Sequence, residues 1–348
     1  MEKKSLLGMT LAELTEVVKE VGLPRFATKQ IVDWLYKKKV TKIEEMTNLS
    51  KLGRANLSAS YQVGAIPPSS KQVSVDGTIK YLYQVGENQF VEAVYIPTDT
   101  HATICVSTQV GCKMNCLFCM TGKQGFTANL TTNQIINQIQ SLPEVDALTN
   151  IVFMGMGEPL DNVDELFKAL DILTSPYGYG WSPHRITVST IGTFKGLQRF
   201  LAESECHLAI SLHSPIPEER AQLMPVEKAF PIKDVIEMVK KYNFFHQRRL
   251  SFEYIVFKNL NDSERHAHKL AKLLYGVPCR VNLIRFHAIP GVDLLTSDLN
   301  RMTHFRDILN KKGVICTIRA SRGEDIFAAC GMLSTAKSKQ SEEELGIN

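Results

Sequence analysis

The 348-residue sequence contains no apolar run of the roughly 18 residues that a membrane-spanning helix requires. Two lysines stand near its start, but no apolar segment follows them, so the first residues do not resemble a signal peptide. A strong excess of charge of either sign is also missing, because the formal net charge is only +4. We therefore expect a cytoplasmic protein without membrane contact, whose charge permits a nucleic-acid partner without requiring one.

Internal repeats are absent as well. Hydrophobic residues make up 44% of the chain and charged residues 22%, which is the balance of a soluble globular protein. The length fits one large domain of about 200–250 residues with a smaller one, or a single α/β barrel with additions. The polar, charge-rich residues 334–348 are predicted to form a flexible tail.

Residues 1–60 are predicted to be helical. Thr10 and Glu13 have the spacing of a capping box, apolar residues at helical spacing follow as far as residue 21, and a second such helix covers 27–36. Residues 70–98 are predicted to form short strands with a turn at Asp76.

From about residue 101 short apolar strands alternate with helical segments. The predicted strands are 104–110, 150–154, 185–190, 208–212, 252–256, 281–286 and 315–318. The predicted helices are 132–141, 163–173, 194–202, 232–242, 263–274 and 298–311. This alternation indicates an α/β fold with a parallel sheet, as a complete barrel, a partial barrel or an open doubly wound sheet.

Three of the eight cysteines form a tight cluster. Cys112, Cys116 and Cys119 have the spacing CxxxCxxC directly after a predicted strand. Three thiolates this close can bind three irons of a cubane cluster and leave the fourth iron open to a substrate group. A zinc site that adds a distant fourth ligand is the alternative.

Polar groups also follow other predicted strands. Gly157 permits close approach of the backbone to a ligand, and the Glu158 carboxylate can pair with an ammonium group, although an ordinary strand-to-helix turn is the alternative. Ser189 ends the strand 185–190, and Ser211 and His213 lie on one side of the next strand's end. At successive strand ends of one barrel, these side chains predict one pocket.

The cysteine spacing, with Phe118 before the third cysteine, resembles the radical S-adenosylmethionine (SAM) superfamily. The segments 106–112, 155–159, 211–215 and 328–331 together resemble the RlmN/Cfr family of RNA adenine methyltransferases, and the RlmN branch in particular. The resemblance implies a partial (β/α)6 TIM-like barrel over 99–333. It also implies a helical RNA-binding accessory domain over 1–60 and a small β linker over 61–98.

The resemblance also implies roles for particular residues. The three clustered cysteines would bind a [4Fe–4S] cluster, Cys330 would become S-methylated, Glu92 would accept a proton, and Cys105 would pair with Cys330. The residues implied to contact SAM are Gly157, Glu158, Ser189, Ser211, Leu212, His213 and His287. His287 stands where the family often has asparagine, and histidine can also donate a hydrogen bond. Without the resemblance, Cys330 would be interpreted as a small buried hydrophobe and Glu92 as an exposed strand carboxylate. The remaining cysteines that we interpret as structural are Cys206, Cys279 and Cys316.

The implied activity is methylation of adenine C2 in 23S rRNA, at the peptidyl-transferase centre, and of adenosine 37 in tRNA. It would use two SAM molecules per turnover, a transient protein–RNA crosslink and an electron donor such as flavodoxin or ferredoxin, and a monomer is expected. The alternatives are C8 methylation of the same rRNA adenosine with antibiotic resistance, a radical SAM enzyme acting on a small molecule or peptide, and a non-catalytic zinc protein that binds RNA. Candidate phosphate contacts are Lys37, Lys38, Lys39, Lys240, Lys241, Arg248 and Arg249.

Overall fold

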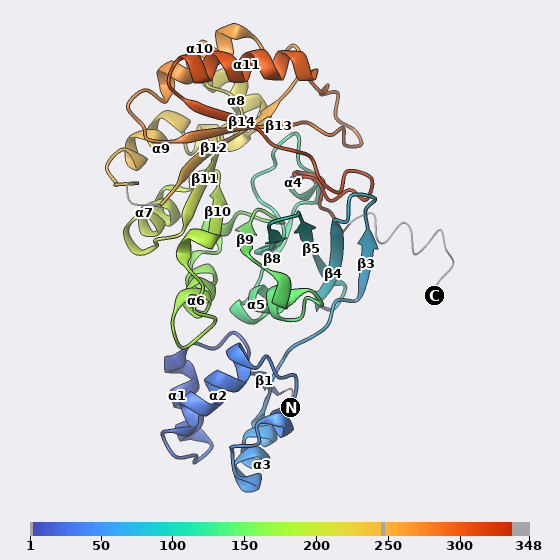
Figure 1. Ribbon diagram of the computed structural model, residues 1–348, viewed down its shortest axis with the longest axis vertical. Coiled ribbons are helices and arrows are strands. Elements are labelled where there is room, and N and C mark those ends of the chain that lie inside the picture. Colours follow the sequence, from blue (N-terminus) through green and yellow to red (C-terminus); the bar gives the residue numbers. More distant parts are fainter. Residues whose placement is uncertain (1–2, 245–247, 336–348) are drawn as a thin grey trace.

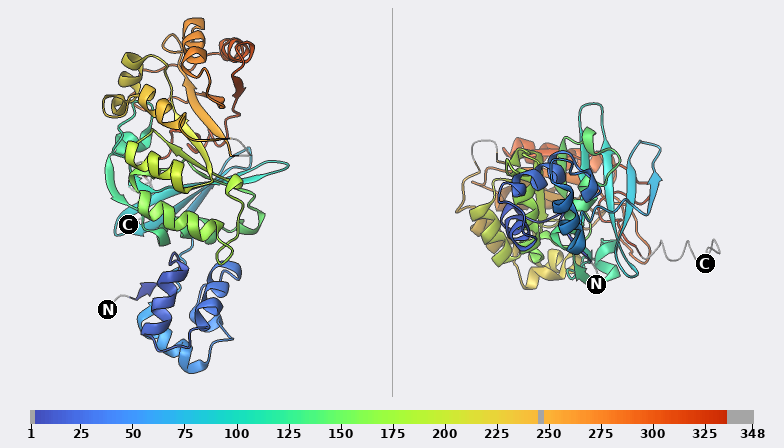
Figure 2. Two further views of the ribbon diagram at one scale, coloured as in Figure 1. Left: turned by 90° about the vertical axis from the view of Figure 1, so that its left-hand side faces the viewer. Right: turned by 90° about the horizontal axis from the view of Figure 1, so that it is seen from below.

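The computed structural model describes residues 3–244 and 248–335. A helical N-terminal lobe lies below a larger α/β domain (Figure 1), and the side view in Figure 2 shows the same two parts. Of the predicted tail 334–348, only Ser334 and Thr335 are among the described residues. No helix in the described ranges is long and apolar enough to cross a membrane.

The N-terminal lobe is built from short helices. It consists of β1 (Lys4–Ser5), α1 (Leu11–Glu20), α2 (Ala27–Val32), a π-helical turn (Asp33–Lys37), a 3-10 turn (Ile43–Glu45), α3 (Lys51–Ser60) and β2 (Tyr61–Gln62). The predicted capping box is present, because the Thr10 hydroxyl accepts a hydrogen bond from the Glu13 amide while the Glu13 carboxylate accepts one from the Thr10 amide. α3 lies within the region predicted to be helical, although the sequence did not delimit it, and Ser50 caps it with a hydroxyl that accepts the Gly53 amide.

The lobe is bonded to two helices of the α/β domain, α5 (Thr132–Gln140) and α6 (Val163–Thr174). Asn133 of α5 donates to the carbonyls of Leu7 and Gly64 at 2.9 and 3.1 Å. Lys168 of α6 forms an ion pair with Glu13 at 2.8 Å. One hydrophobic core runs through both parts, so the lobe is packed against the α/β domain and not merely tethered to it.

The centre of the α/β domain is a ten-stranded sheet in the order β14-β13-β12-β11-β10-β9-β6-β5-β4-β3. Its parallel strands are β6 (Ala102–Cys105), β9 (Asn150–Phe153), β10 (Ile186–Thr190), β11 (His207–Ser211), β12 (Leu250–Val256), β13 (Arg280–Arg285) and β14 (Ile315–Ile318). Neighbours in this part follow chain order, and right-handed crossovers then place every connecting helix on one face, which curls the sheet. Since β14 pairs only with β13 in the described ranges, the curl stays open, and the predicted partial barrel is confirmed.

Three antiparallel strands extend the sheet beyond β6. They are β3 (Ser70–Val73), β4 (Ile79–Gly86) and β5 (Gln89–Pro97). The predicted turn at Asp76 lies between β3 and β4, where its carboxylate accepts a hydrogen bond from the Thr78 amide at 2.9 Å. These strands are continuous with the barrel sheet and place Glu92 of β5 beside it.

The prediction of one strand over 104–110 is wrong. The chain leaves the large sheet after Cys105, and β7 (Gln109–Gly111) pairs instead with β8 (Phe126–Asn129) in a separate two-stranded sheet. Ser107 explains the break, because its amide donates to the Gln138 side chain and its hydroxyl donates to the Glu92 carbonyl. These hydrogen bonds to distant residues take the place of the backbone bonds that a continuous strand would form with its neighbours.

The helices of the barrel agree with the prediction to within a few residues, except that α4 (Met120–Gln124) and α8 (Pro217–Leu223) were not predicted. Besides these two, α5 and α6, they are α7 (Phe194–Glu203), α9 (Ile232–Val239), α10 (Glu264–Leu273) and α11 (Leu299–Lys311). The sequence reading missed α8, whose seven residues are too few to display a helical period.

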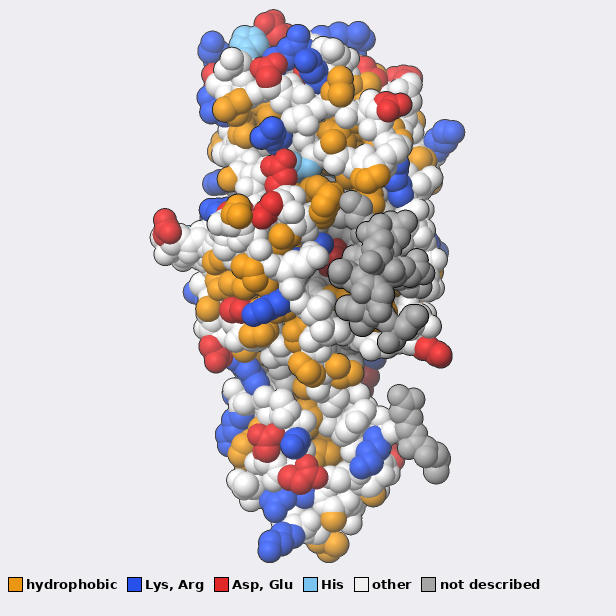
Figure 3. Space-filling model, turned by 90° about the vertical axis from the view of Figure 1, so that its right-hand side faces the viewer, with side chains coloured by type: hydrophobic (Ala, Val, Ile, Leu, Met, Phe, Trp, Pro, Cys, Tyr) orange, Lys and Arg blue, Asp and Glu red, His pale blue; other side chains and the backbone are white. Residues whose placement is uncertain are grey.

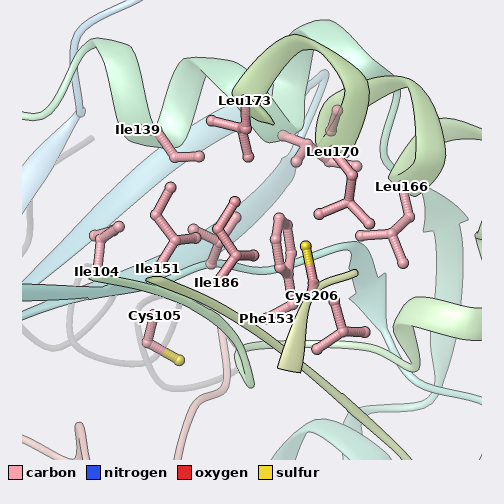
Figure 4. Close-up of a cluster of buried hydrophobic side chains, with 14 of the residues drawn as sticks. Ile104, Cys105, Ile139, Ile151, Phe153, Leu166, Leu170, Leu173, Ile186 and Cys206 are labelled. Atoms are coloured by element: carbon pink, nitrogen blue, oxygen red, sulfur yellow. The ribbon is translucent and has the colours of Figure 1, made fainter. Parts of the chain in front are cut away.

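The main core lies between the sheet and its helices (Figure 4). Ile151 and Phe153 of β9 pack against Leu170 and Leu173 of α6. Cys206 lies within this core, so the structure places it where a structural cysteine is expected. Cys105 points the opposite way, because successive side chains of a strand alternate between its two faces.

A buried ion pair fixes the end of β11. Arg220 of α8 has no solvent exposure, and its guanidinium donates to the carbonyls of Ser211 and Leu212 at 3.0 Å each. Glu227 pairs with this guanidinium and also accepts the Ile232 amide at 3.0 Å. All three guanidinium nitrogens and one carboxylate oxygen of this group are therefore bonded to buried partners.

Replacing Glu227 should destabilise the fold strongly, because it leaves the buried Arg220 charge without compensation. Glu227→Ala is expected to cost about 3–5 kcal/mol, and so to lower the melting temperature by roughly 10 °C in calorimetry. The matched control is Glu237→Gln, since Glu237 pairs with Lys240 at 2.7 Å on the surface and should change stability by less than about 1 kcal/mol. Equal melting temperatures for the two variants would contradict this interpretation.

Candidate functional site

A cavity of about 730 Å³ lies on the inner side of the curled sheet, opposite the helices. Most predicted site residues line it, namely Cys105, Cys112, Cys116, Cys119, Gly157, Glu158, Ser189, Ser211, His213, His287 and Cys330. Leu212 and Glu92 are the two predicted residues that are not among its lining. The structure thus gathers residues that are more than two hundred positions apart in the chain.

The three clustered cysteines lie on the connection between β7 and α4. Backbone bonds hold this loop, because the Cys112 amide donates to Gly125 at 2.9 Å and the Leu117 amide donates to Leu223 at 2.8 Å. Phe118, between the second and third cysteines, packs edge-on against the His213 ring with the centroids 4.7 Å apart. The aromatic position of the motif therefore anchors the loop to the end of β11.

The donor set of the cluster fits an iron–sulfur centre. Burial raises the pKa of Cys112 to about 12 and the pKa of Cys116 further, so both are neutral thiols when free. Bound iron cations would favour the thiolates, as metal ligation of cysteine requires. In the part of the chain that the structure describes, no three His, Cys, Asp or Glu side chains converge as one ion would need. Thiolates of a cubane need no such convergence, because each binds a different iron.

Gly157 and Glu158 stand at the carboxyl end of β9. Gly157 has φ +98°, and a Cβ there would approach the Gln109 side chain to 2.5 Å, so the turn requires glycine. The Glu158 carboxylate accepts hydrogen bonds from the Thr190 hydroxyl at 2.6 Å and from the amides of Ile191 and Leu160 at 3.0 Å each. Burial raises the pKa of Glu158 to about 7, and these donors oppose the rise. Three bonds leave an ionised carboxylate with acceptor capacity for an ammonium group.

The ends of β10 and β11 add Ser189, Ser211 and His213 to the wall. His213 has φ 57°, in the left-handed region, and its Nδ1 accepts the Ile255 amide at 3.0 Å. Burial and the nearby Arg220 lower the pKa of His213 to about 3, so the ring is neutral and Nε2 carries the proton. Leu212 points into the core, so only its backbone is available to a ligand.

His287 lies just after β13 and is 6% exposed. Its Nε2 lies 2.9 Å from the Ser321 hydroxyl. Its Nδ1 lies 3.0 Å from a Glu324 carboxylate oxygen but outside hydrogen-bonding geometry, and is therefore a buried ring nitrogen without a hydrogen bond. A polar atom of this kind on a cavity wall fits a cofactor that completes its bonding.

Cys330 and Cys105 both line the cavity, and Cys330 lies close enough to contribute to the raised pKa of the buried Cys105 thiol. Cys330 is exposed to solvent through the cavity, unlike the buried hydrophobe that the residue alone suggested. Desolvation by the surrounding protein raises the pKa of the Cys330 thiol, the Arg319 guanidinium opposes that rise, and the Glu253 carboxylate adds to it. Cys330 is therefore a solvent-reachable thiol with a cation beside it that would favour the thiolate.

Glu92 is separated from the cavity by the chain that follows Cys330. It is 5% exposed, not an exposed strand carboxylate, and pairs with Lys80 at 3.0 Å. Its other carboxylate oxygen accepts the Ser334 amide at 2.9 Å. Burial raises the pKa of Glu92, and Lys80 opposes the rise, which leaves a carboxyl group suited to accept a proton.

Sequence reasoning missed two residues beside Cys330. Glu253 of β12 and Arg319, directly after β14, both line the cavity and act on the ionisation of Cys330. Glu253 is bonded to Ser251 and Asn282, each at 2.8 Å. The available signals were a carboxylate inside an apolar strand and an arginine at a strand's carboxyl end.

Comparison with known proteins shows similarity along nearly the whole chain. Residues 106–271 match the radical SAM superfamily, and residues 4–63 match the ribosomal RNA large subunit methyltransferase N-terminal domain. The "Probable dual-specificity RNA methyltransferase RlmN" of Parabacteroides distasonis is 73% identical over 97% of this chain and 98% of its own. The "Dual-specificity RNA methyltransferase RlmN" of Nautilia profundicola is 42% identical over 92% and 96%, respectively.

A solved structure is similar as well. A radical SAM methyltransferase from Sphaerobacter thermophilus has a TM-score of 0.89 and 37% identity, covering 95% of this chain and 99% of its own. The similarity includes the N-terminal lobe and the barrel, since almost all of both chains is covered.

The cysteine cluster predicts a sharp difference among cysteine substitutions. Replacing Cys112, Cys116 or Cys119 by alanine should abolish the iron–sulfur absorbance of anaerobically reconstituted protein and most of its bound iron, because each thiolate holds one iron. The matched control is Cys279→Ala, which removes a half-buried thiol outside the cavity and should keep the iron content of the unsubstituted protein. Full iron content in any of the first three variants would contradict the assignment.

Proposed function

Since this chain belongs to the RlmN family of radical SAM RNA methyltransferases, we propose that it methylates C2 of adenosine in 23S rRNA and of adenosine 37 in tRNA. The observation that carries the proposal is the solvent-reachable Cys330, which shares one cavity with the cysteine cluster and Cys105. The names of the relatives, which specify dual specificity and RNA, support two RNA substrates. Methylation of C8 is the alternative, and the nucleoside analysis below distinguishes the two ring positions.

The cofactors would occupy the carboxyl ends of the strands. Cys112, Cys116 and Cys119 would hold the cluster, while Glu158, Ser211 and the other strand-end groups would hold SAM. Bound there, cluster and SAM supply an electron, a methyl group and a carbon-centred radical, with two SAM molecules used per turnover. We expect a flavodoxin or ferredoxin as electron donor and a monomeric enzyme.

Within this chain, Cys330 carries the methyl group. As a thiolate, favoured by Arg319, it accepts the methyl group on sulfur. After loss of a hydrogen atom, its methylene carbon bonds to the adenine ring carbon, which ordinary nucleophilic methylation does not reach. The resulting crosslink joins Cys330 to the RNA.

Glu92 and Cys105 resolve the crosslink. The adduct gives up one electron, which the bound cluster would take back, and the Glu92 carboxylate takes the proton from the substituted ring carbon, for which its raised pKa is suited. The Cys105 thiolate then bonds to Cys330 sulfur and breaks the bond from that sulfur to the transferred carbon, which takes a proton to become the methyl group. A thiol reductant would reduce the resulting Cys105–Cys330 disulfide before the next turnover. For Glu92 to reach the base, the Ser334 amide has to release its carboxylate.

The direct test is mass spectrometry of nucleosides from 23S rRNA and tRNA in cells with and without the gene. Loss of 2-methyladenosine upon deletion is expected from both RNAs, and plasmid-borne wild-type protein should restore it. Loss of 8-methyladenosine instead would show that the methylated ring carbon is C8 and not C2. If no modified adenosine changes, RNA methylation is the wrong activity and a small-molecule or peptide substrate takes its place.

Cys330→Ala tests the route. The variant should transfer no methyl group to RNA, because the carrier sulfur is missing, yet should still cleave SAM reductively, because the cluster ligands are intact. Product mass spectrometry measures the first and chromatography of 5′-deoxyadenosine the second. Cys316→Ala, at a buried cysteine outside the cavity, is the matched control and should methylate normally. Methylation by Cys330→Ala would exclude the S-methylcysteine route.

A further inference from the structure

The cavity extends well beyond the end of the barrel that carries the cysteine cluster. Its lining includes the first residues of β9, β11 and β13, namely Asn150, His207 and Arg280. It also includes Ser211, the last residue of β11. Four steps along a strand cover about 13 Å, so the cavity runs the length of the strands, and a second part of it lies at their amino ends.

This second part carries arginines without partners. Arg249 directly precedes β12, Arg280 begins β13, and both are exposed and line the cavity. Within residues 3–244 and 248–335, neither guanidinium makes an ion pair or a side-chain hydrogen bond. Arg319 and Arg322 also line the cavity, whereas the acidic residues in its described lining are Glu158 and Glu253. The wall is therefore cationic, although the chain as a whole carries only +4.

The neighbouring Arg248 differs from Arg249 in its exposure to solvent. Arg248 is buried, and its guanidinium donates to the carbonyls of Cys206, Leu201 and Phe200 at 3.1–3.3 Å. It thereby satisfies carbonyls in and just after the last turn of α7, and its burial keeps the guanidinium from a ligand at the surface. Of the two candidate phosphate contacts in this pair, only Arg249 is available.

A pair of histidines braces the backbone of Arg249. The Nδ1 atom of His207 accepts the Arg249 amide at 2.9 Å, and its ring stacks on His184 with centroids 5.6 Å apart and planes 7° apart. Burial lowers the pKa of His207 to about 4, so the ring is neutral and keeps Nδ1 as an acceptor. Both rings line the cavity and present flat surfaces beside the cations.

The same end of the barrel adjoins the N-terminal lobe. Trp181, three residues before His184, lines a hollow of about 300 Å³ together with Lys37 and Lys39 of the lobe. Lys39 forms an ion pair with Asp146, shortly before β9 begins. Lysines of the lobe thus line this hollow, while arginines of the barrel line the cavity. On the face in Figure 3, by contrast, blue and red side chains are interspersed.

We propose that the amino-end rim, defined as Arg249, Arg280, His184 and His207, binds the RNA strand beside the target adenosine, so that the base enters the barrel from the end opposite the cysteine cluster. The inference rests on the proposed function, because it takes RNA as the substrate. Guanidinium groups match phosphate oxygens in a two-point geometry, and the stacked rings suit an unstacked base. An acidic electron-donor protein fits less well, since electrons are needed at the other end of the cavity.

The first experiment protects arginines in the unsubstituted holoenzyme. Arginines are modified with phenylglyoxal with and without unmodified tRNA, and the modified peptides are quantified by mass spectrometry. RNA should protect Arg249 and Arg280 at least severalfold. Arg265, which is exposed on α10 and outside the cavity, should react equally with and without RNA, and the buried Arg248 should react in neither case. Equal reactivity of Arg249 and Arg280 in both conditions would overturn the proposal.

The second experiment measures affinity in Arg249→Gln/Arg280→Gln holoenzyme by anisotropy of labelled tRNA across a salt series. Binding should weaken roughly tenfold per arginine, and the slope of log affinity against log salt should fall by about 1.4 for two phosphate contacts on a single strand. The matched control, Arg265→Gln/Lys269→Gln on α10, removes the same charge from an exposed helix and should leave both values near those of the unsubstituted enzyme.

The outcomes separate this inference from the proposed function. Unchanged affinity and slope in the rim variant, with tight binding by the unsubstituted enzyme, would overturn the inference alone. Equal losses in the rim variant and its control would also overturn it, because they would indicate general electrostatics. Lost response to a flavodoxin with unchanged RNA affinity would assign the rim to a protein partner. If unsubstituted holoenzyme neither binds nor methylates tRNA or rRNA, the proposed function itself fails.

Discussion

In the large sheet, β6 and β9 to β14 pair in parallel throughout, so the carboxyl ends of these strands meet at one edge of the sheet and their amino ends at the other. Because the crossovers keep every helix on one face, the inner face has no helical cover and encloses a cavity. The Glu158 turn, Ser211 and His213 share the first edge for this reason alone. Arg249 and Arg280 share the second for the same reason.

Features that depend on short stretches of chain could be predicted. The alternation of strands and helices, the CxxxCxxC loop and the polar strand ends each occupy about ten residues, and the structure places them as that pattern indicates. The break after Cys105 could not be predicted, because it depends on Gln138, a residue thirty-one positions from Ser107. The enclosure of Glu92 likewise depends on Ser334, at the other end of the chain. The burial of Arg248 and the exposure of Arg249 could not be predicted either, because they depend on which carbonyls lie near each guanidinium.

Arginine serves two opposite purposes in this barrel. Arg220 and Arg248 are buried. The guanidinium of Arg220 donates to carbonyls at the end of β11, and that of Arg248 donates to carbonyls at and just after the end of α7. Arg249 and Arg319 face the cavity without carboxylate ion pairs in the described ranges. Buried charge of the first kind stabilises only while every partner is present. Arg249 and Arg319 are exposed, so water solvates their charges, and under the RNA-binding proposal a phosphate would replace that water beside Arg249.

One short segment connects Cys330, the proposed methyl carrier, to Glu92, the proposed proton acceptor. Cys330 faces the cavity, and four residues later the Ser334 amide occupies the Glu92 carboxylate. The same segment is anchored through Thr121, whose hydroxyl donates to the Leu333 carbonyl at 2.7 Å, on the helix that follows the cysteine cluster. Under the proposed function, the Ser334 amide would have to release the carboxylate before Glu92 could take a proton from a base bonded to Cys330. Chain connectivity would then reinforce the order that the chemistry already requires, in which the ring carbon is substituted before it loses its proton.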